Sequence, residues 1–421
     1  MIILQNGTIV DPDSGYVGKK DVAIENGIIA AIEENIVGKE EDTIIDCNGK
    51  IIGPGLVDVH VHFRDPGFTY KEDIYSGSKA AIKGGFTSVI LMANTKPAVD
   101  NPETIEYILK KGRETGIRVY TCATITKGMA GKEKNDFEAL LKAGACGFTD
   151  DGVPIMDENL VREVMEDAAK CNTVLSFHEE DPKYIENNGV NRGKASAYYE
   201  IGGSDRQAEI TMVERDIKIA LETGTIVNFQ HISTKEAVEL IREAKKKGNN
   251  IHAEATPHHI ALTEDAVIEH NTLAKMNPPL RTEEDRQAII AGLQDGTIDL
   301  IATDHAPHSA EEKARPITEA PSGILGLETA FALSKEKLVD SGKIDVLQLF
   351  CKMSKNPREL YGINAGKLAK NSPADLVVVD MDKKWKVETF ASKSQNSPFK
   401  NKEFTGKIVM TICDGKILYQ E

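Results

Sequence analysis

Short apolar strands alternate with amphipathic helices from residue 51 to about residue 360, and this alternation constrains the fold more than any other feature of the chain. The predicted strands are 51–57, 87–93, 117–123, 145–149, 173–177, 225–230, 251–255 and 298–303. Helices are expected between them, for example over 76–83 and 235–247. Eight strands that alternate with helices are typical of a closed (β/α)8 barrel of the TIM type.

Open, doubly wound sheets show the same alternation and are the alternative fold. Their dinucleotide-binding version carries a Gly-x-Gly-x-x-Gly turn, and the chain has no such turn. Polar residues at the carboxyl ends of the strands fit both folds. We therefore predict the barrel.

Both ends of the chain have a different residue pattern from the middle. Residues 1–50 and 363–421 contain short β-prone runs, and hairpin-type turns such as Asn6-Gly7, Asn26-Gly27 and Asp414-Gly415 follow several of them. Two β-rich ends around an α/β middle predict one small β domain that is built from both terminal segments. The barrel would then span residues 51–362.

Composition narrows the class of protein. The formal net charge is −15, and no basic tract interrupts this acidity, so nucleic acid and anionic membrane surfaces are not expected as partners. The six cysteines include no Cys-x-x-Cys pair, a pattern of reduced thiols in a cytoplasmic protein. The chain begins without the features of a signal peptide and has no apolar run of the roughly 20 residues that a membrane helix needs.

His60 and His62 stand at the end of the first predicted barrel strand. Alternate residues of a strand point to the same side, so the two imidazoles can converge on one metal ion. Arg64 follows two residues later and could hold an anionic substrate beside that metal. This stretch predicts a metal site at the strand end.

Other imidazoles and carboxylates also follow predicted strands. They are Asp150, Asp151, His178, His231 and Asp304. In a barrel the carboxyl ends of the strands form one mouth, where residues distant in sequence meet. Imidazole and carboxylate ligands without thiolate suit zinc, with manganese, cobalt or iron as alternatives, and the set is large enough for one or two ions.

The choice between Asp150 and Asp151 is less direct, because both follow Thr149. Asp150 could instead cap the turn at Gly152. We favour Asp151 as the ligand.

Four segments resemble motifs of the dihydroorotases, in the bacterial type I branch of the amidohydrolase superfamily. They are Asp58–Pro66, Asn277–Arg281, Ala302–His308 with Lys313 beyond it, and Pro321–Glu328. The resemblance runs along the whole chain, in the family's order and spacing. It differs from many members at one point: no lysine lies between Ala143 and Asp151, where those members carry a carboxylated lysine between two metal ions.

The resemblance implies a zinc-dependent interconversion of (S)-dihydroorotate and N-carbamoyl-L-aspartate in pyrimidine biosynthesis. His60 and His62 would bind the first ion, Asp151 would bridge, His178 and His231 would bind the second, and Asp304 would touch the first ion and act as general acid/base. Substrate contacts would come from His62, Arg64, Asn94, Asn277, His308, Ser322 and Gly323. Because an aspartate replaces the lysine, occupancy of both metal positions stays open.

The implied chemistry agrees with physical expectation. A metal lowers the pKa of bound water from 15.7 towards ~7 and polarises an amide carbonyl. Asp304 would take a proton from that water and pass it to the leaving ring nitrogen. Residues 309–318 are polar and would form either a mobile lid over the site or an ordinary solvated loop.

Two other functions remain as alternatives. A cyclic-amide hydrolase could act on hydantoins, dihydropyrimidines or allantoin, although these substrates lack the carboxylate for which Arg64 and His308 are placed. A catalytically inactive scaffold could serve a partner such as aspartate transcarbamoylase, although all six ligands are present. We expect a homodimer, with aspartate transcarbamoylase as a candidate partner.

Overall fold

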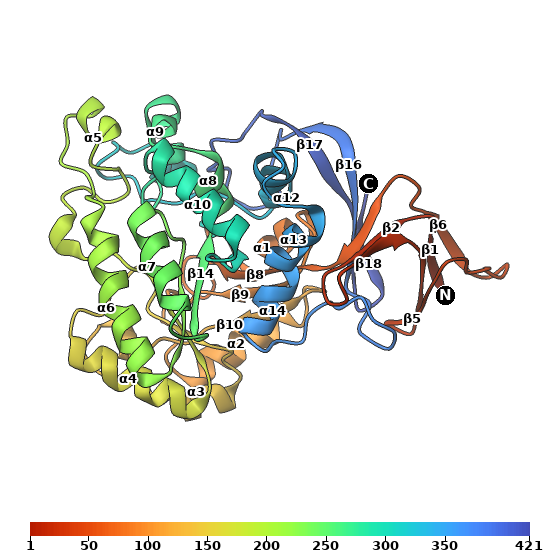
Figure 1. Cartoon of the computed structure of the whole chain (residues 1–421), viewed down its shortest axis with the longest axis horizontal. Coiled ribbons are helices and arrows are strands. Elements are labelled where there is room, and N and C mark those ends of the chain that lie inside the picture. Colours follow the sequence, from red (N-terminus) through yellow and green to blue (C-terminus); the bar gives the residue numbers. More distant parts are fainter.

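The computed structural model describes all of residues 1–421. Figure 1 shows a helix-covered barrel on one side and β-sheets on the other, with both chain termini at the β-sheet end. No helix is long and apolar enough to cross a membrane.

Eight parallel strands form the barrel. They are β8 (Leu56–Val61), β9 (Phe86–Leu91), β10 (Arg118–Thr121), β11 (Phe148–Thr149), β12 (Val174–Phe177), β13 (Ile226–Phe229), β14 (Ile251–Ala255) and β15 (Leu300–Ile301). The pairing runs in chain order within two groups, β8 to β10 and β11 to β15. Parallel bridges between Ala123 and Phe148 and between Val61 and His305 join the groups into a ring. The predicted (β/α)8 barrel is confirmed.

Helices surround this ring. The longer ones are α1 (Ile74–Lys83), α2 (Pro102–Gly112), α3 (Phe137–Ala143), α4 (Glu158–Cys171), α6 (Gln207–Thr223), α7 (Lys235–Lys245) and α10 (Glu283–Asp295). Shorter ones are α5 (Lys194–Tyr198), α8 (Pro257–Ala261), α9 (Asp265–His270), α11 (Ala310–Lys313), α12 (Ala330–Ser334), α13 (Val346–Phe350) and α14 (Asn356–Leu360). Single 3-10 turns occur at Lys127–Met129, Pro182–Tyr184 and Asn271–Ala274, and π-helical turns at Lys335–Val339 and Cys351–Lys355.

Helix α4 illustrates why these segments are helical. The Asp157 side chain accepts a hydrogen bond from the Asn159 amide at the start, and Asn172 ends the helix in the left-handed conformation at φ 49°. Leu160, Val161, Val164, Met165 and Ala168 are buried. Their spacing of three and four residues puts them on one face, which packs against the strands.

The terminal segments form two sheets. One has the order β5 (Ile28–Glu33), β4 (Asp21–Glu25), β1 (Ile2–Gln5) and β6 (Thr43–Asp46). The other has the order β18 (Lys416–Gln420), β17 (Glu403–Cys413), β16 (Leu376–Lys386), β7 (Ile51–Pro54), β2 (Thr8–Asp11) and β3 (Tyr16–Lys19). Antiparallel pairing of β7 with β16 joins the two ends of the chain. The predicted small β domain from both termini is confirmed.

The run 51–57 was predicted as one barrel strand, and this is wrong. Ile51–Pro54 pairs with β2 and β16 in the small sheet, and the barrel strand begins only at Leu56. Gly55 lies between them, and a Cβ there would come within 2.1 Å of Thr87 Oγ1. The apolar character of a run does not show which sheet it joins. The predicted domain boundary at residue 51 is therefore several residues before the start of the first barrel strand at Leu56.

Arg118, on barrel strand β10, connects the barrel to the small β domain. Its guanidinium donates to Asp375 from Nε at 2.9 Å and from Nη2 at 3.3 Å, and it also pairs with Asp414. The Asp375 side chain is fully buried. Removal of the cation from a buried ion pair leaves an uncompensated carboxylate and strongly destabilises the folded protein.

We expect Arg118→Met to lower the free energy of unfolding by about 3 kcal/mol, because it leaves Asp375 buried and uncompensated. Urea denaturation measures the change. Arg162→Met is the control, since Arg162 pairs with Glu222 between side chains that are 37% and 45% exposed. That variant should lose at most about 1 kcal/mol, and equal losses in both would contradict the role of Arg118.

Candidate metal centre

The predicted ligands lie at or just beyond the carboxyl ends of five barrel strands. His60 lies in β8 and His62 just beyond it, and the others follow their strands within three residues: Asp151 after β11, His178 after β12, His231 after β13 and Asp304 after β15. All six side chains are buried. Three groups of residues can each hold a metal ion, because the ligand atoms within each group lie within 4.8 Å of one another. The groups are His60, His62 and Asp151; His60, His231 and Asp304; and Asp151, His178 and His231.

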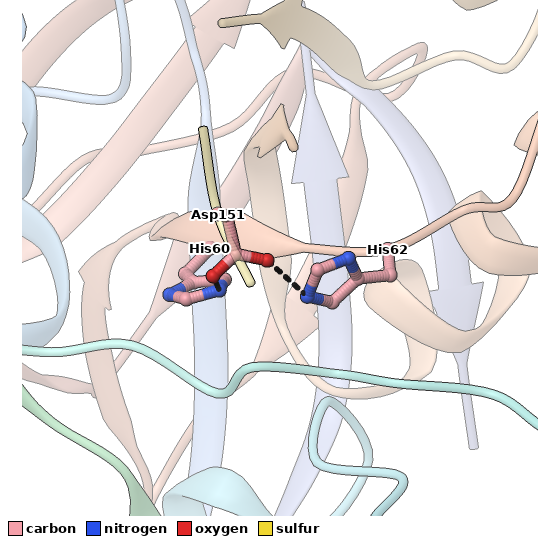
Figure 2. A group of neighbouring side chains, drawn as sticks. All are labelled: His60, His62 and Asp151. Carbon is pink, nitrogen blue, oxygen red and sulfur yellow. Dashed lines mark ion pairs between the residues drawn. The ribbon is translucent and has the colours of Figure 1, made fainter. Parts of the chain in front are cut away.

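The Asp151 carboxylate lies between the histidines. Its Oδ1 is 3.6 Å from His60 Nε2, 3.5 Å from His178 Nδ1 and 3.8 Å from His231 Nε2. Its Oδ2 is 3.4 Å from His62 Nε2, and Figure 2 shows the carboxylate between the His60 and His62 rings. Burial opposes ionisation, but hydrogen bonds with these imidazoles hold the pKa of Asp151 well below its usual range.

Asp150 faces a different part of the molecule. Its carboxylate accepts hydrogen bonds from the backbone amide of Ile125 at 2.8 Å and from the amide and hydroxyl of Thr126. Burial raises its pKa to about 6, even though these hydrogen bonds act in the opposite direction. Asp150 therefore anchors the loop after β10, and its neighbour alone reaches the histidines.

Asp304 and His231 share an unusual backbone conformation. Their φ angles are 46° and 33°, in the left-handed region that residues with a Cβ avoid. Such conformations persist where the surrounding structure enforces them, and they are common at functional sites. At Asp304 the result is that Oδ1 lies 2.9 Å from His62 Nε2 and 3.5 Å from His60 Nε2.

The donor set fits a divalent metal ion. His60 Nε2 is buried without a hydrogen-bond partner and lies among the carboxylates of Asp151 and Asp304. Two ring nitrogens of the cluster, His60 Nε2 and His231 Nδ1, have no hydrogen-bond partner. Nitrogen and oxygen donors that converge in such a buried site match the needs of zinc and related ions.

Two of these histidines each have a buried carboxylate within hydrogen-bond distance of one ring nitrogen. Glu254 Oε1 lies 2.7 Å from His60 Nδ1, and Glu180 Oε2 lies 2.9 Å from His178 Nε2. A carboxylate at one ring nitrogen keeps the proton there and directs the other nitrogen to the metal. His60 is thereby directed through Nε2 and His178 through Nδ1.

Our sequence analysis missed Glu254 and Glu180. Glu254 could have been noticed as the one carboxylate inside the apolar strand Ile251–Ala255. Glu180 lies in a loop two residues after His178, and no local pattern marks it.

A polar cavity of about 430 Å³ opens beside the centre. Its lining includes six of the predicted substrate residues: His62, Arg64, Asn94, Asn277, His308 and Ser322. It also includes Asn188, Lys275 and Thr318, which were not predicted. Gly323 is not part of the lining and follows Ser322 as a buried residue with φ 151°. The volume suits a small molecule.

Two of the lining residues with predicted substrate roles also lie against the metal centre. Asn94 Oδ1 lies 3.0 Å from His62 Nδ1, and Asn94 Nδ2 donates to Asp151 Oδ2 at 3.1 Å. Asn277 Nδ2 lies 3.4 Å from His178 Nε2, while its Oδ1 is buried without a partner. Both amides therefore border the cavity and the candidate ligands together.

Arg64 and His308 form a cationic corner of the cavity. Arg64 Nε donates to the Pro307 carbonyl at 3.3 Å, and Nη2 donates to His308 Nε2 at 3.3 Å. Neither bond pairs the guanidinium with a carboxylate. The other ring nitrogen of His308, Nδ1, lies 3.3 Å from Lys71 Nζ and 3.5 Å from Glu312 Oε2. Burial and the nearby Arg64 charge lower the pKa of His308, which keeps the ring neutral.

Two buried lysines hold the loop that contains Ser322. Lys275 Nζ donates to the carbonyls of Ile317 and Ala320, both at 2.7 Å. Lys313 Nζ donates to those of Pro321 at 2.9 Å and Gly323 at 3.1 Å. Burial lowers the pKa of Lys275 to about 8 and that of Lys313 to about 7. Within 309–318, residues Ala310–Lys313 form the short helix α11, whose first turn the Ser309 side chain caps.

Comparison with known proteins agrees with this geometry. The model of the Amidohydrolase family matches residues 51–418. The dihydroorotase of Clostridioides difficile (strain 630) is 51% identical over 100% of both chains, and that of Clostridium acetobutylicum is 47% identical over 100% of both chains. The chain belongs to the amidohydrolase family and, within it, to the dihydroorotases.

Among solved structures, an L-hydantoinase (dihydropyrimidinase) from Arthrobacter aurescens is similar, with a TM-score of 0.88 and 26% identity. The match covers 100% of this chain and 96% of the other. A D-hydantoinase from a Thermus species, at 23% identity and a TM-score of 0.85, shares the fold and covers 100% and 95% of the two chains.

The contrast between the two neighbouring aspartates gives a direct test. We expect Asp151→Asn to abolish most metal binding, because it removes the charge that faces four imidazoles. Asp150→Asn should keep the metal and lower stability only, because Asp150 bonds to Ile125 and Thr126. Elemental analysis of the purified variants measures the difference. Loss of metal from the Asp150 variant alone would contradict this assignment.

Proposed function

We propose that the protein catalyses the reversible interconversion of (S)-dihydroorotate and N-carbamoyl-L-aspartate, the cyclic-amide step of pyrimidine biosynthesis. The observation that carries this proposal is the corner formed by Arg64 and His308. It places a guanidinium without a carboxylate partner in a polar cavity beside a cluster of four histidines and two aspartates. The full-length dihydroorotase relatives support the same reaction.

The metal would be zinc, with one or two ions in each subunit. His60, His62 and Asp304 would hold the first ion, His178 and His231 the second, and Asp151 would reach both. When bound, such an ion supplies a Lewis acid that polarises the ring amide and makes water a better nucleophile at neutral pH. The carboxylates of Glu254 and Glu180 would keep the His60 and His178 rings in the required tautomers.

Asp304 would transfer a proton from the attacking water to the ring nitrogen. Burial by itself raises the pKa of Asp304, but the His60 and His62 imidazoles lower it to about 2. The carboxylate is therefore ionised at neutral pH and lines the cavity, where it can accept a proton from the attacking water. It would then pass the proton to the ring nitrogen as the amide bond breaks.

The remaining cavity residues would orient the substrate. Arg64 can offer paired donors to the substrate carboxylate, and Asn94 and His308 border the same corner. Asn277, with its buried unpaired Oδ1, and the backbone at Ser322–Gly323 would contact the pyrimidine ring. His62 would lie next to the reacting carbonyl. Together these contacts would fix the ring with its amide bond toward Asp304.

Asp304→Asn tests the proton transfer. We expect the variant to keep its fold and bound metal and to lose roughly 10²–10⁴-fold in turnover, the usual contribution of a general acid/base. Steady-state kinetics with dihydroorotate and with carbamoyl-aspartate measure the loss in both directions. Near-normal turnover in a metal-loaded variant would remove Asp304 from the mechanism.

Arg64→Met tests the choice of substrate. Sites built around a polar partner reject analogues that lack it by up to about 10⁴–10⁵, so the native protein should strongly prefer dihydroorotate to dihydrouracil. The variant should lose most of this preference, as measured by kcat/KM for both compounds. The control is Arg113→Met, an exposed arginine at the C-terminal end of α2, which should leave the preference unchanged.

The same measurement addresses the alternative function. Hydantoins and dihydropyrimidines carry no carboxylate, and the fold is shared with hydantoinases. Comparable kcat/KM for dihydroorotate and dihydrouracil in the native protein would favour that alternative.

The expected assembly remains a prediction. A homodimer and an association with aspartate transcarbamoylase follow from the family resemblance alone, and a cytoplasmic location is expected from the cysteine pattern. Sedimentation of the purified protein alone would test the homodimer, and sedimentation of its mixture with aspartate transcarbamoylase would test that association.

A further inference from the structure

The chain between β16 and β17 leaves the small sheet and lies against the barrel mouth. We call residues 387–402 the C-terminal strap; in Figure 1 it belongs to the dark-blue connection at the ends of these two strands. The Ser394 hydroxyl donates to the Lys71 carbonyl at 2.8 Å, and Lys393 Nζ donates to the Thr69 carbonyl at 3.0 Å. The strap is therefore fastened to the loop that follows β8 and His62.

Asn396 connects the strap to two further loops at the mouth. Its Nδ2 donates to the carbonyls of Ala306 and Gly323, both at 3.0 Å. Its Oδ1 accepts from the His308 amide, and its backbone carbonyl accepts from the Leu325 amide, each at 3.0 Å. The residue is 3% exposed. The amide thus uses both donors and its acceptor on the loops 306–308 and 322–325.

These two loops approach each other very closely beside Asn396. A Cβ at Gly323 would lie 2.7 Å from both the Ala306 carbonyl oxygen and His308 Cδ2. With φ at 151°, Gly323 also has a backbone conformation that a side chain disfavours. The carbonyl oxygens of Ala306 and Gly323 both accept from the same Asn396 nitrogen, so this amide group bridges the two loops.

The bridged loops supply one side of the cavity. Ala306, His308 and Ser322 line it, and His308 accepts a hydrogen bond from Arg64. None of the hydrogen bonds of Asn396 goes to a candidate metal ligand. A shift of either loop would therefore change where the substrate is held.

We propose that Asn396 is a positioning residue that sets the spacing between the two substrate-binding loops, so that the small β domain contributes to substrate affinity. The inference rests on the proposed function for its kinetic consequence only. Asparagine is suited to this place because it combines two donors with one acceptor. An aspartate of the same shape would direct a carboxylate at the Ala306 and Gly323 carbonyls and lose both donated bonds.

Asn396→Asp provides the test. We expect KM for dihydroorotate to rise by about tenfold or more, since buried hydrogen bonds are replaced by unpaired acceptors, while bound metal is retained and kcat changes less than KM. Hydrogen exchange, followed by mass spectrometry in the metal-loaded protein, should be faster in peptides that cover 306–308 and 322–325. This second measurement needs no substrate, so it tests the positioning role even if the proposed reaction is wrong.

Gln395→Glu is the matched control. It makes the same change from amide to carboxylate one residue earlier, but the Gln395 side chain bonds only within the strap, to Phe390 and Ser392. This variant should keep the native KM and exchange rates. If Asn396→Asp fails to fold, Asn396→Ala removes the same donors without adding a charge. Native KM and native exchange in a folded Asn396 variant, or equal effects in the control, would overturn the proposal.

Discussion

Closure of the ring of parallel strands is the constraint on which the rest of the structure depends. The bridge between Val61 and His305 brings the end of the first barrel strand beside the end of the last. Only because of this contact does His62 lie 2.9 Å from Asp304, which is 242 residues away in the chain. An open sheet would leave these two strands at opposite edges, and the cluster of imidazoles and carboxylates would not form.

Charged side chains at the barrel mouth lie in two regions, one with carboxylates and one with cations. The metal centre gathers two aspartates among four histidines, with Glu254 and Glu180 behind two of the rings. On the other side, Lys275 and Lys313 are buried and donate to backbone carbonyls, and Arg64 also has a carbonyl partner. Cations without carboxylate partners are costly to bury. Arg64 and Lys275 line the cavity and favour an anionic ligand there, in agreement with the substrate that we propose.

The hydantoinase structures share this fold over 96% and 95% of their chains. Fold alone does not determine the reaction, which depends on the side chains at the mouth. The cavity here contains groups that can recognise a carboxylate, held on loops that the small β domain contacts through Asn396. The terminal β domain is thus more than an addition to the barrel, because part of it contacts the substrate side of the site.

The sequence by itself determined the eight strands, the terminal β domain and the residues at the strand ends, because hydrophobic periodicity and turn residues act locally. His60 and His62 were predictable as a pair since two residues along a strand share a face. Tertiary structure decided what local patterns do not encode. It separated Asp151 from Asp150, assigned Ile51–Pro54 to the small sheet, and brought Glu254, Glu180 and Asn396 to the site. Each of these depends on which distant segment a side chain or strand meets, and that is settled only when the ring closes and the two ends of the chain pair.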